Sequence, residues 1–151
     1  MDLIFAPAAA PDIDTIYGLS KDLIDRYENL QDIDYEKVLG WVRRKIETHI
    51  SEYVCVFADG QKAGYYRFSP SDGRMEIDDL YILPAFRNRG IGTFIIEKCC
   101  RETDLPVVLY VFARNTGAFS LYRRLGFRVE QAIGTSRCIL VREGPTKQED
   151  L

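Results

Sequence analysis

The feature that most constrains this chain is a loop that separates an apolar strand from a helix. The strand stops at Pro84, and the loop that follows holds two arginines, Arg87 and Arg89, and two glycines, Gly90 and Gly92. Glycine lets backbone N–H groups approach a phosphate closely, and the first turn of a helix offers unpaired donors at the positive end of the helix dipole. The two guanidinium groups add formal charge. The segment therefore predicts a cradle for an anion of the pyrophosphate type.

Two better-known phosphate loops do not fit these residues. A P-loop requires GxxxxGK followed by Ser or Thr, and the chain lacks that string. A dinucleotide-binding fingerprint that begins at Gly90 needs glycine or alanine at position 95, which is Ile95. It also needs an acidic residue about 20 positions further on, where Phe112 and Ala113 stand. The loop therefore belongs to another class of anion-binding motif.

Hydrophobic periodicity and turn residues predict a mixed α/β fold with short connections. A strand begins at Leu3, and two helices follow, the second capped by Asp32 or Asp34. The apolar stripe expected on the second helix consists of Val38, Trp41, Val42, Ile46, His49 and Ile50. Turn signals at residues 59–60 and 71–73 then join three strands into a meander.

The second half of the chain alternates helices and strands. After the loop we expect a helix at residues 87–101, a strand at 106–113, a helix at 115–125 that ends at Gly126, and strands at 127–130 and 138–141. The complete order is β-α-α-β-β-β-α-β-α-β-β. It predicts an α/β (α+β) fold in which helices cover a central sheet.

A second motif follows the loop by about 25 residues. The loop itself meets the pattern Arg/Gln-x-x-Gly-x-Gly/Ala with Arg87, Gly90 and Gly92. Residues 115–127 read Asn-Thr-Gly-Ala-Phe-Ser-Leu-Tyr-Arg-Arg-Leu-Gly-Phe, which matches N-x-x-A-x-x-L-Y-x-x-L-G-F. In this order and spacing the two motifs resemble those of the GCN5-related N-acetyltransferase (GNAT) superfamily, and the resemblance covers residues 3–142. It implies the GNAT fold, a mixed and mostly antiparallel central sheet flanked by helices.

The resemblance also implies a site for acetyl-CoA as cosubstrate, with no metal. In the family the pantothenate arm of CoA pairs with the backbone of the strand before the loop, and the loop amides meet the pyrophosphate. The implied cofactor-binding residues are Leu80, Tyr81, Ile82, Arg87, Asn88, Arg89, Gly90, Ile91, Gly92, Thr93, Asn115 and Tyr122. A helix cap alone would also explain Asn115.

Two catalytic residues follow from the same resemblance. Tyr122 matches the family tyrosine that faces the CoA sulfur, where a phenol with a pKa of about 10 can donate a proton to the expelled thiolate. Glu76, on the strand before the loop, matches a glutamate base found in several branches of the family. Asp78, Asp79 after a bulge, and water are alternative bases, whereas Tyr110 stands where some members carry an acid.

Charge is divided unevenly along the chain. Residues 1–80 hold 16 acidic against 9 basic side chains, a balance of −7, and residues 81–151 hold 7 against 11, a balance of +4. The positive half contains both motifs and suits the cofactor phosphates. The region of the first two helices holds the acidic residues Asp22, Asp25, Glu28, Asp32, Asp34 and Glu36, with Tyr27 and Tyr35 among them. We expect a small cationic amine as acceptor, although a solvated helix face would explain the same pattern.

The histidine and cysteine content restricts the chemistry further. His49 is the only histidine, so a multi-histidine metal site is excluded. Cys55, Cys99, Cys100 and Cys138 form no CxxC pair. We expect them to be small, buried side chains in a reducing compartment.

Length and composition are those of one ordinary domain. With 151 residues, 46% hydrophobic and 28% charged, we expect a single domain over residues 1–143 and a disordered tail over 144–151. The longest uncharged apolar runs fall short of the roughly 20 residues that a membrane span needs. Asp2 stands where a secretory signal would carry positive charge. A cytoplasmic location is therefore expected.

The resemblance to the GNAT superfamily implies an acyltransferase, an acetyl-CoA-dependent N-acetyltransferase that acts on a primary amine by direct attack in a ternary complex. A noncatalytic acyl-CoA-binding module, a protein or peptide N-acetyltransferase and a longer acyl group are alternatives, and a homodimer is left open. Binding to nucleic acid through Arg123, Arg124 and Arg128 is disfavoured by the net charge of −3. No membrane partner is expected.

Overall fold

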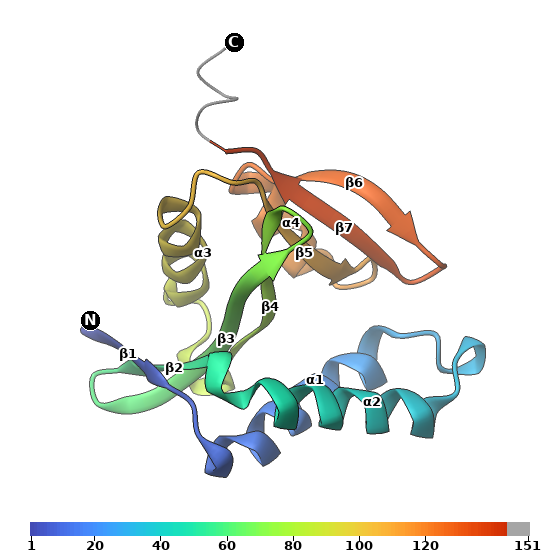
Figure 1. Cartoon of the computed structure of the whole chain (residues 1–151), viewed down its shortest axis with the longest axis horizontal. Coiled ribbons are helices and arrows are strands. Elements are labelled where there is room, and N and C mark those ends of the chain that lie inside the picture. Colours follow the sequence, from blue (N-terminus) through green and yellow to red (C-terminus); the bar gives the residue numbers. More distant parts are fainter. Residues whose placement is uncertain (145–151) are drawn as a thin grey trace. The chain divides into compact units, whose positions relative to one another are not determined.

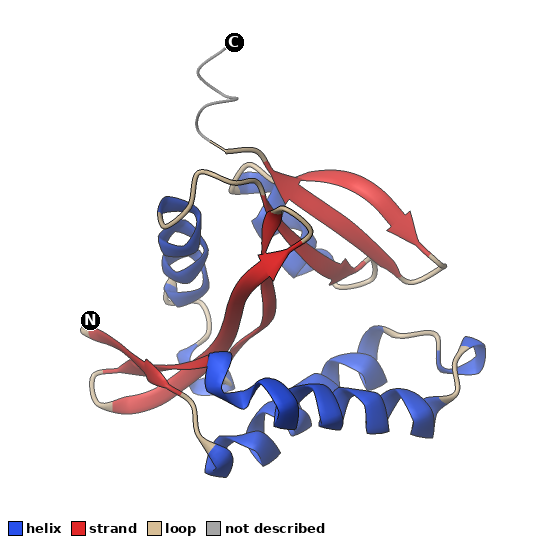
Figure 2. Ribbon diagram, viewed as in Figure 1, coloured by secondary structure: helices blue, strands red, loops and turns tan. Residues whose placement is uncertain are grey.

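A computed structural model describes residues 1–144, which form seven strands and four α-helices in the expected order (Figures 1 and 2). The strands are β1 (Leu3–Pro7), β2 (Tyr53–Ala58), β3 (Gln61–Ser71), β4 (Arg74–Ile82), β5 (Val107–Phe112), β6 (Arg128–Ile133) and β7 (Arg137–Arg142). The helices are α1 (Ile13–Tyr27), α2 (Tyr35–His49), α3 (Ile91–Arg101) and α4 (Thr116–Arg124).

The strands form one sheet in the order β1-β2-β3-β4-β5-β7-β6. The pairs β1–β2, β2–β3, β5–β7 and β6–β7 are antiparallel, and β4–β5 is parallel. The expected fold class, a mixed and mostly antiparallel sheet flanked by helices, is confirmed. Two compact units make up the described chain: residues 1–67 with 79–87, and residues 68–78 with those from 88 onward. Strands β3 and β4 contribute residues to both units.

In the first unit, α1 and α2 pack along one another. Helix α2 is capped by Asp34, whose Oδ1 accepts a hydrogen bond of 3.3 Å from the Lys37 amide, so the second of the two expected caps is the correct one. Its buried residues are Leu39, Val42 and Ile46. The expected stripe was wrong at Trp41, which is 58% exposed. Leu39, Val42 and Ile46 follow one another at spacings of three and four residues and so lie on one face of α2, and Trp41 lies off that face.

Both predicted hairpin turns are present. Asp59 and Gly60 have φ angles of 49° and 83° between β2 and β3, and Asp72 and Gly73 have 49° and 77° between β3 and β4. Two successive residues with positive φ are the signature of the two-residue turn whose twist matches the flanking strands.

In the second unit, α3 begins at Ile91, four residues later than expected. Asn88 and Gly90 have φ angles of 62° and 82°. Because left-handed residues cannot lie inside a right-handed helix, the segment around them is a loop, preceded by a 3-10 turn over Pro84–Phe86. The buried residues of helix α3 are Ile91, Ile95, Ile96 and Cys99.

The four thiols are free within the described chain. Cys55 and Cys99 are buried as expected, and Cys100 and Cys138 are partly buried. Gly144 is also buried, and a Cβ atom there would collide with the carbonyl oxygen of Asp104. The rest of the predicted tail, residues 145–151, lies outside the described residues. No helix in residues 1–144 has the length and apolar character needed to cross a bilayer.

Candidate functional site

Strand β4 has an irregular backbone at Asp79. Its φ of 50° lies in the left-handed region, which non-glycine residues rarely adopt. Before this point, Met75 and Glu76 pair in parallel with β5. After it, the strand continues to Ile82. A left-handed residue inside a strand breaks the alternation of side chains as a β-bulge does, which is the geometry that the sequence allowed for at Asp79.

The backbone beyond Asp79 has a defined orientation. The Leu83 amide donates a hydrogen bond of 2.8 Å to the carbonyl oxygen of Ala63 on β3. Because peptide groups alternate along a strand, Tyr81 also points its backbone groups toward β3, and Leu80 and Ile82 point theirs away. The backbone groups of Leu80 and Ile82 are therefore directed as strand-like pairing with a ligand would require.

Gly64 permits this arrangement, and the sequence interpretation missed it. A Cβ atom at position 64 would collide with the carbonyl oxygen of Tyr81. A glycine inside a β-rich run is a known sign of close backbone approach, so the sequence did carry a signal.

Arg87 folds back onto the end of β4. Its Nε donates a hydrogen bond of 3.0 Å to the carbonyl oxygen of Ile82. Two of the predicted cofactor-binding residues are thereby brought together. The contact holds the 3-10 turn against the strand and places a guanidinium group on the side of β4 that faces away from β3.

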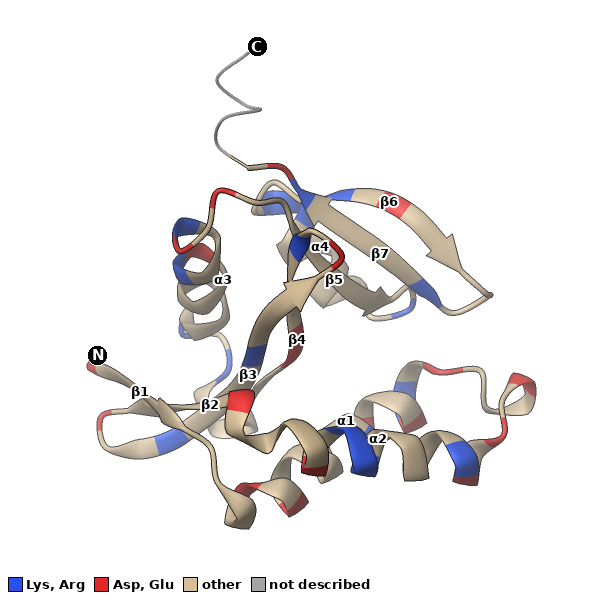
Figure 3. Ribbon diagram, in the orientation of Figure 1, with Lys and Arg blue, Asp and Glu red and all other residues tan. Residues whose placement is uncertain are grey.

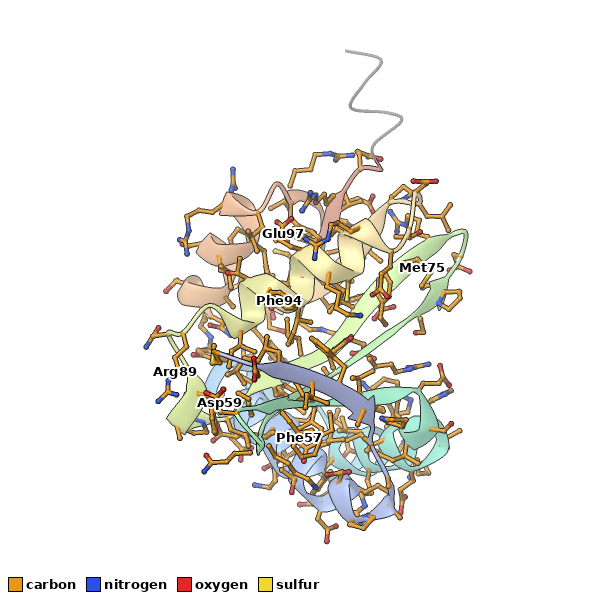
Figure 4. All side chains as sticks on the ribbon, turned by 90° about the vertical axis from the view of Figure 1, so that its left-hand side faces the viewer. Phe57, Asp59, Met75, Arg89, Phe94 and Glu97 are labelled. Atoms are coloured by element: carbon orange, nitrogen blue, oxygen red, sulfur yellow. The ribbon has the colours of Figure 1, made fainter. Side chains whose placement is uncertain are left out.

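Helix α3 begins without a capping side chain. Gly90 is its N-cap residue, and the first helical bond runs from the Phe94 amide to the Gly90 carbonyl at 3.0 Å. The amides of Ile91, Gly92 and Thr93 therefore have no acceptor within the helix. A Cβ atom on Gly90 would meet no atom within 4 Å beyond its chain neighbours, and Arg89 is exposed on the same loop (Figure 4). These donors fit an anion such as a phosphate.

Helix α4 is capped at both ends. Asn115 Oδ1 accepts a bond of 3.4 Å from the Ala118 amide, so Asn115 acts as the N-cap. At the other end, Gly126 donates to the Arg123 carbonyl and Phe127 to the Tyr122 carbonyl, each at 3.1 Å. This pair of bonds is a Schellman motif, and Gly126 supplies its left-handed residue with a φ of 93°.

The C-terminal cap also fixes the ring of Tyr122. In a Schellman motif the residue after the glycine commonly contacts the side chain five positions earlier, and here the rings of Phe127 and Tyr122 have centroids 6.2 Å apart. Burial raises the pKa of Tyr122 to about 12. The phenol is therefore protonated at neutral pH and can donate a hydrogen bond, and the raised pKa makes it a weaker proton donor than an ordinary tyrosine.

The three candidate bases on β4 have different surroundings. Glu76 and Asp78 are half-buried. The carboxylate of Asp79 accepts hydrogen bonds from the phenols of Tyr53 at 2.5 Å and Tyr81 at 2.8 Å, and it lies 3.0 Å from Lys45 Nζ. Because both of its oxygens are engaged by donors, Asp79 is poorly placed to take a proton from an amine.

Acidic and basic residues alternate along the α1–α2 region (Figure 3), and two of its six predicted acidic residues form ion pairs with close neighbours. Asp22 pairs with Arg26 at 3.1 Å, and Asp25 pairs with Lys21 at 2.8 Å. Glu28 accepts a hydrogen bond from the backbone amide of Asn29, and Asp32 accepts one from the Asn29 side-chain amide. Asp34 accepts one from the backbone amide of Lys37. The attraction of this region for a cation is therefore weaker than its count of carboxylates suggests.

The predicted residues are divided between the two units. The first unit holds Leu80, Tyr81, Ile82 and Arg87, and the second holds Glu76, the loop from Asn88 to Thr93, Asn115 and Tyr122. In residues 1–144 no group of three or more His, Cys, Asp or Glu side chains is arranged to hold a metal ion.

Known proteins resemble this chain in sequence and in fold. The sequence profile of the Acetyltransferase (GNAT) family matches residues 16–127. A spermidine N(1)-acetyltransferase of Thermoplasma acidophilum is 28% identical over 104 residues, which cover 66% of this chain and 65% of that protein. An uncharacterized N-acetyltransferase of Methanocaldococcus jannaschii is 37% identical over 62 residues, which cover 38% of this chain and 27% of that protein. The matches thus span less than two thirds of these curated relatives.

Among solved structures, the PaiA N-acetyltransferase of Thermoplasma acidophilum in complex with coenzyme A superimposes with a TM-score of 0.69 at 19% identity. The alignment covers 95% of this chain and 99% of that one. The fold is thus shared almost from end to end. Since the family profile covers most of the chain, this protein belongs to the GNAT acetyltransferase family.

Proposed function

We propose that this chain transfers the acetyl group of acetyl-CoA to a primary amine by direct attack in a ternary complex. The observation that carries the proposal is the start of α3. Gly90 leaves three amides without helical acceptors, and Arg87 and Arg89 precede it on the same loop. A cosubstrate with a pyrophosphate group satisfies these donors.

The proposed cofactor contacts use two kinds of donor. The amides of residues 88–93 and the side chains of Arg87 and Arg89 bind the pyrophosphate. The outward-facing backbone groups of Leu80 and the amide of Ile82 pair with the pantothenate arm, with Tyr81 between them, while the Ile82 carbonyl accepts from Arg87. Asn115 contacts the arm in addition to capping α4.

In the proposed reaction the amine nitrogen attacks the thioester carbonyl. The new C–N bond forms, the C–S bond breaks, and the electron pair of that bond goes to sulfur. Tyr122 donates a hydrogen bond or its phenolic proton to the departing thiolate, and Glu76, directly or through water, accepts the proton lost from the attacking amine. Exchange with solvent then returns both side chains to their starting forms.

The proposed acceptor is a small cationic amine. The Thermoplasma acidophilum relative named as a spermidine acetyltransferase supports this class. The acidic side chains on α1 and α2 support it as well, although their local ion pairs reduce the net field. Protein and peptide amines and a noncatalytic acyl-CoA-binding role are the competing possibilities.

A screen of amine acceptors with acetyl-CoA tests the proposal. Thiol release is measured with polyamines, aminoglycosides, basic peptides, neutral amines and acidic amino acids. Turnover with small cationic amines above all others is expected. Preference for neutral or acidic amines would reject the acceptor class, and CoA binding without thiol release for any amine would favour the noncatalytic module.

A further inference from the structure

We propose that Asp79 is a positioning residue, whose carboxylate holds the left-handed backbone that orients Leu80–Ile82 for the cosubstrate. This inference rests on the proposed function, because it assigns a task to a residue beside the proposed cofactor strand. Asp79 itself contacts neither the acetyl group nor the amine in this proposal.

The carboxylate joins three elements of the first unit. Tyr53, at the start of β2, donates to Oδ2 at 2.5 Å. Lys45 on α2 lies 3.0 Å from the same oxygen, and Tyr81 on β4 donates to Oδ1 at 2.8 Å. The side chain of Asp79 is only 8% exposed, and that of Lys45 only 17%. Hydrogen bonds to a charged, buried acceptor are stronger than surface ones and constrain geometry more tightly.

The contacts of the Asp79 carboxylate explain why this residue keeps an unfavourable backbone conformation. A non-glycine residue in the left-handed region carries a conformational cost, and such residues persist only where the surroundings determine them. Asp72 and Asp59 adopt the same φ, but each lies in a tight turn beside a glycine. Asp79 lies inside a strand, so its side-chain contacts take the place of the turn.

The backbone at Asp79 decides which way the next residues face. With it, Leu80 and Ile82 direct their peptide groups away from β3, and the backbone carbonyl oxygen of Tyr81 approaches Gly64 closely. If Asp79 relaxed to an extended conformation, the alternation of backbone groups along β4 would shift by one residue. Leu80 and Ile82 would then direct their peptide groups toward β3. The groups offered to the pantothenate arm would then be lost.

Lys45 also links β4 to α2, one of the two helices at which we expect the acceptor amine to bind. Its ammonium lies 5.6 Å from the ring centre of the exposed Trp41, one turn earlier on α2. The contacts therefore run from an exposed aromatic side chain through Lys45 and Asp79 to the proposed cofactor strand.

The test compares three variants with one matched control. Asp79→Gly keeps the left-handed backbone accessible but removes every side-chain contact. Asp79→Asn keeps an acceptor without the charge, and Lys45→Met removes one donor while keeping the apolar stem. Asp72→Gly is the control, since it makes the same substitution at the same φ in an exposed turn. Dissociation constants for CoA are measured by calorimetry, and KM and kcat with acetyl-CoA where turnover is found.

For Asp79→Gly we expect the dissociation constant and KM to rise at least fivefold, with kcat at saturation within twofold of the original. Asp79→Asn and Lys45→Met are expected to give smaller increases, and Asp72→Gly none. If Asp79→Gly does not fold, Tyr53→Phe replaces it, because that change deletes a single hydroxyl. Unchanged CoA affinity in these variants would overturn the inference and leave the proposed function standing. Failure of the original chain to bind CoA would overturn both.

Discussion

The Nε of Arg87 donates a hydrogen bond of 3.0 Å to the carbonyl oxygen of Ile82. The arginine that begins the loop motif is thus attached to the last residue of β4. Its role in the local fold comes in addition to any contact with a phosphate, since the bond fixes where the loop leaves the strand.

Replacing Arg87 is therefore expected to weaken cofactor binding for two reasons. Arg87→Ala removes a charge and frees the turn, and a lost charge-assisted hydrogen bond is worth about 1.5 to 3 kcal/mol, or roughly tenfold or more in affinity. Arg87→Lys keeps the charge and should lose less. Calorimetry with CoA measures the change, with Arg101→Ala as the control on an exposed arginine. Equal affinity of Arg87→Ala and the original chain would remove Arg87 from the site.

Gly90 and Gly60 provide a matched pair. Their φ angles are 82° and 83°, and a Cβ on either would meet no atom within 4 Å. Alanine at either position should therefore cost a similar amount of unfolding free energy, about 1 kcal/mol. Only Gly90→Ala should weaken CoA binding, because its strain disturbs the amides that start α3. Thermal melting and calorimetry on both variants check this, and equal CoA affinities would contradict it.

Tyr122→Phe should lower kcat about a hundredfold while leaving CoA affinity nearly unchanged, because it removes only the proton donor. Since burial raises the pKa of Tyr122 to about 12, the phenol stays protonated across the working range. The rate of the unaltered protein should therefore show no loss from ionisation of Tyr122 up to about pH 10. Tyr110→Phe, on the exposed face of β5, serves as control. Full turnover by Tyr122→Phe would exclude its role as the acid.

Glu76→Gln should remove the fall in kcat/KM at low pH, because that limb reports protonation of the base. Asp78→Asn tests the neighbouring acid in the same assay. An unaltered pH profile in Glu76→Gln with an altered one in Asp78→Asn would transfer the role to Asp78. Unaltered profiles in both would assign it to water.

Asp12 should make stability depend on acid pH. Burial opposes its ionisation, but hydrogen bonds from Lys62, the Ala9 amide and Tyr65 outweigh burial and lower the pKa of Asp12 below its ordinary 3.8. A lowered pKa stabilises the fold above the ordinary value, and the gain is lost as pH falls through the folded value. Asp12→Asn should cost about 2 kcal/mol of unfolding free energy at pH 7.

The difference between Asp12→Asn and the original chain should begin to shrink as pH falls toward 3.8, the ordinary pKa of an aspartate, and should disappear below the lowered pKa of Asp12 in the folded chain, where both side chains are uncharged. Denaturant unfolding across pH measures it. Asp22→Asn, which disrupts only an exposed pair, should change little at any pH. A difference for Asp12→Asn that is constant from pH 7 to pH 3 would refute this account.

Patterns that depend on near neighbours were predictable. Each of these features involves residues within about six positions of one another: the caps of α2 and α4, the two hairpin turns and the glycine that ends α4. A stretch of that length contains all the residues that the feature requires. The start of α3 was placed too early. Asparagine adopts the left-handed region more often than most residues, but only at a minority of its positions, so Asn88 did not by itself exclude a helix there.

Contacts between distant residues could not be predicted in the same way. The ion pairs Lys21–Asp25 and Asp22–Arg26 have the four-residue spacing of helix neighbours and were readable from the sequence, but the hydrogen bond from Tyr35 to Asp25, ten positions apart, was not. Trp41 was assigned to the buried stripe because hydrophobicity alone does not say how a helix is rotated against its neighbour.

The sequence by itself determined the family, the order of elements and the two motifs, because each is written in a few adjacent residues whose conformational preferences are local. Only the tertiary structure decided that Asp79 bonds to Tyr53, 26 positions away, and that Gly64 lies beneath Tyr81. The physical reason is that such contacts follow from the packing of whole strands and helices, which brings together groups that no local preference relates.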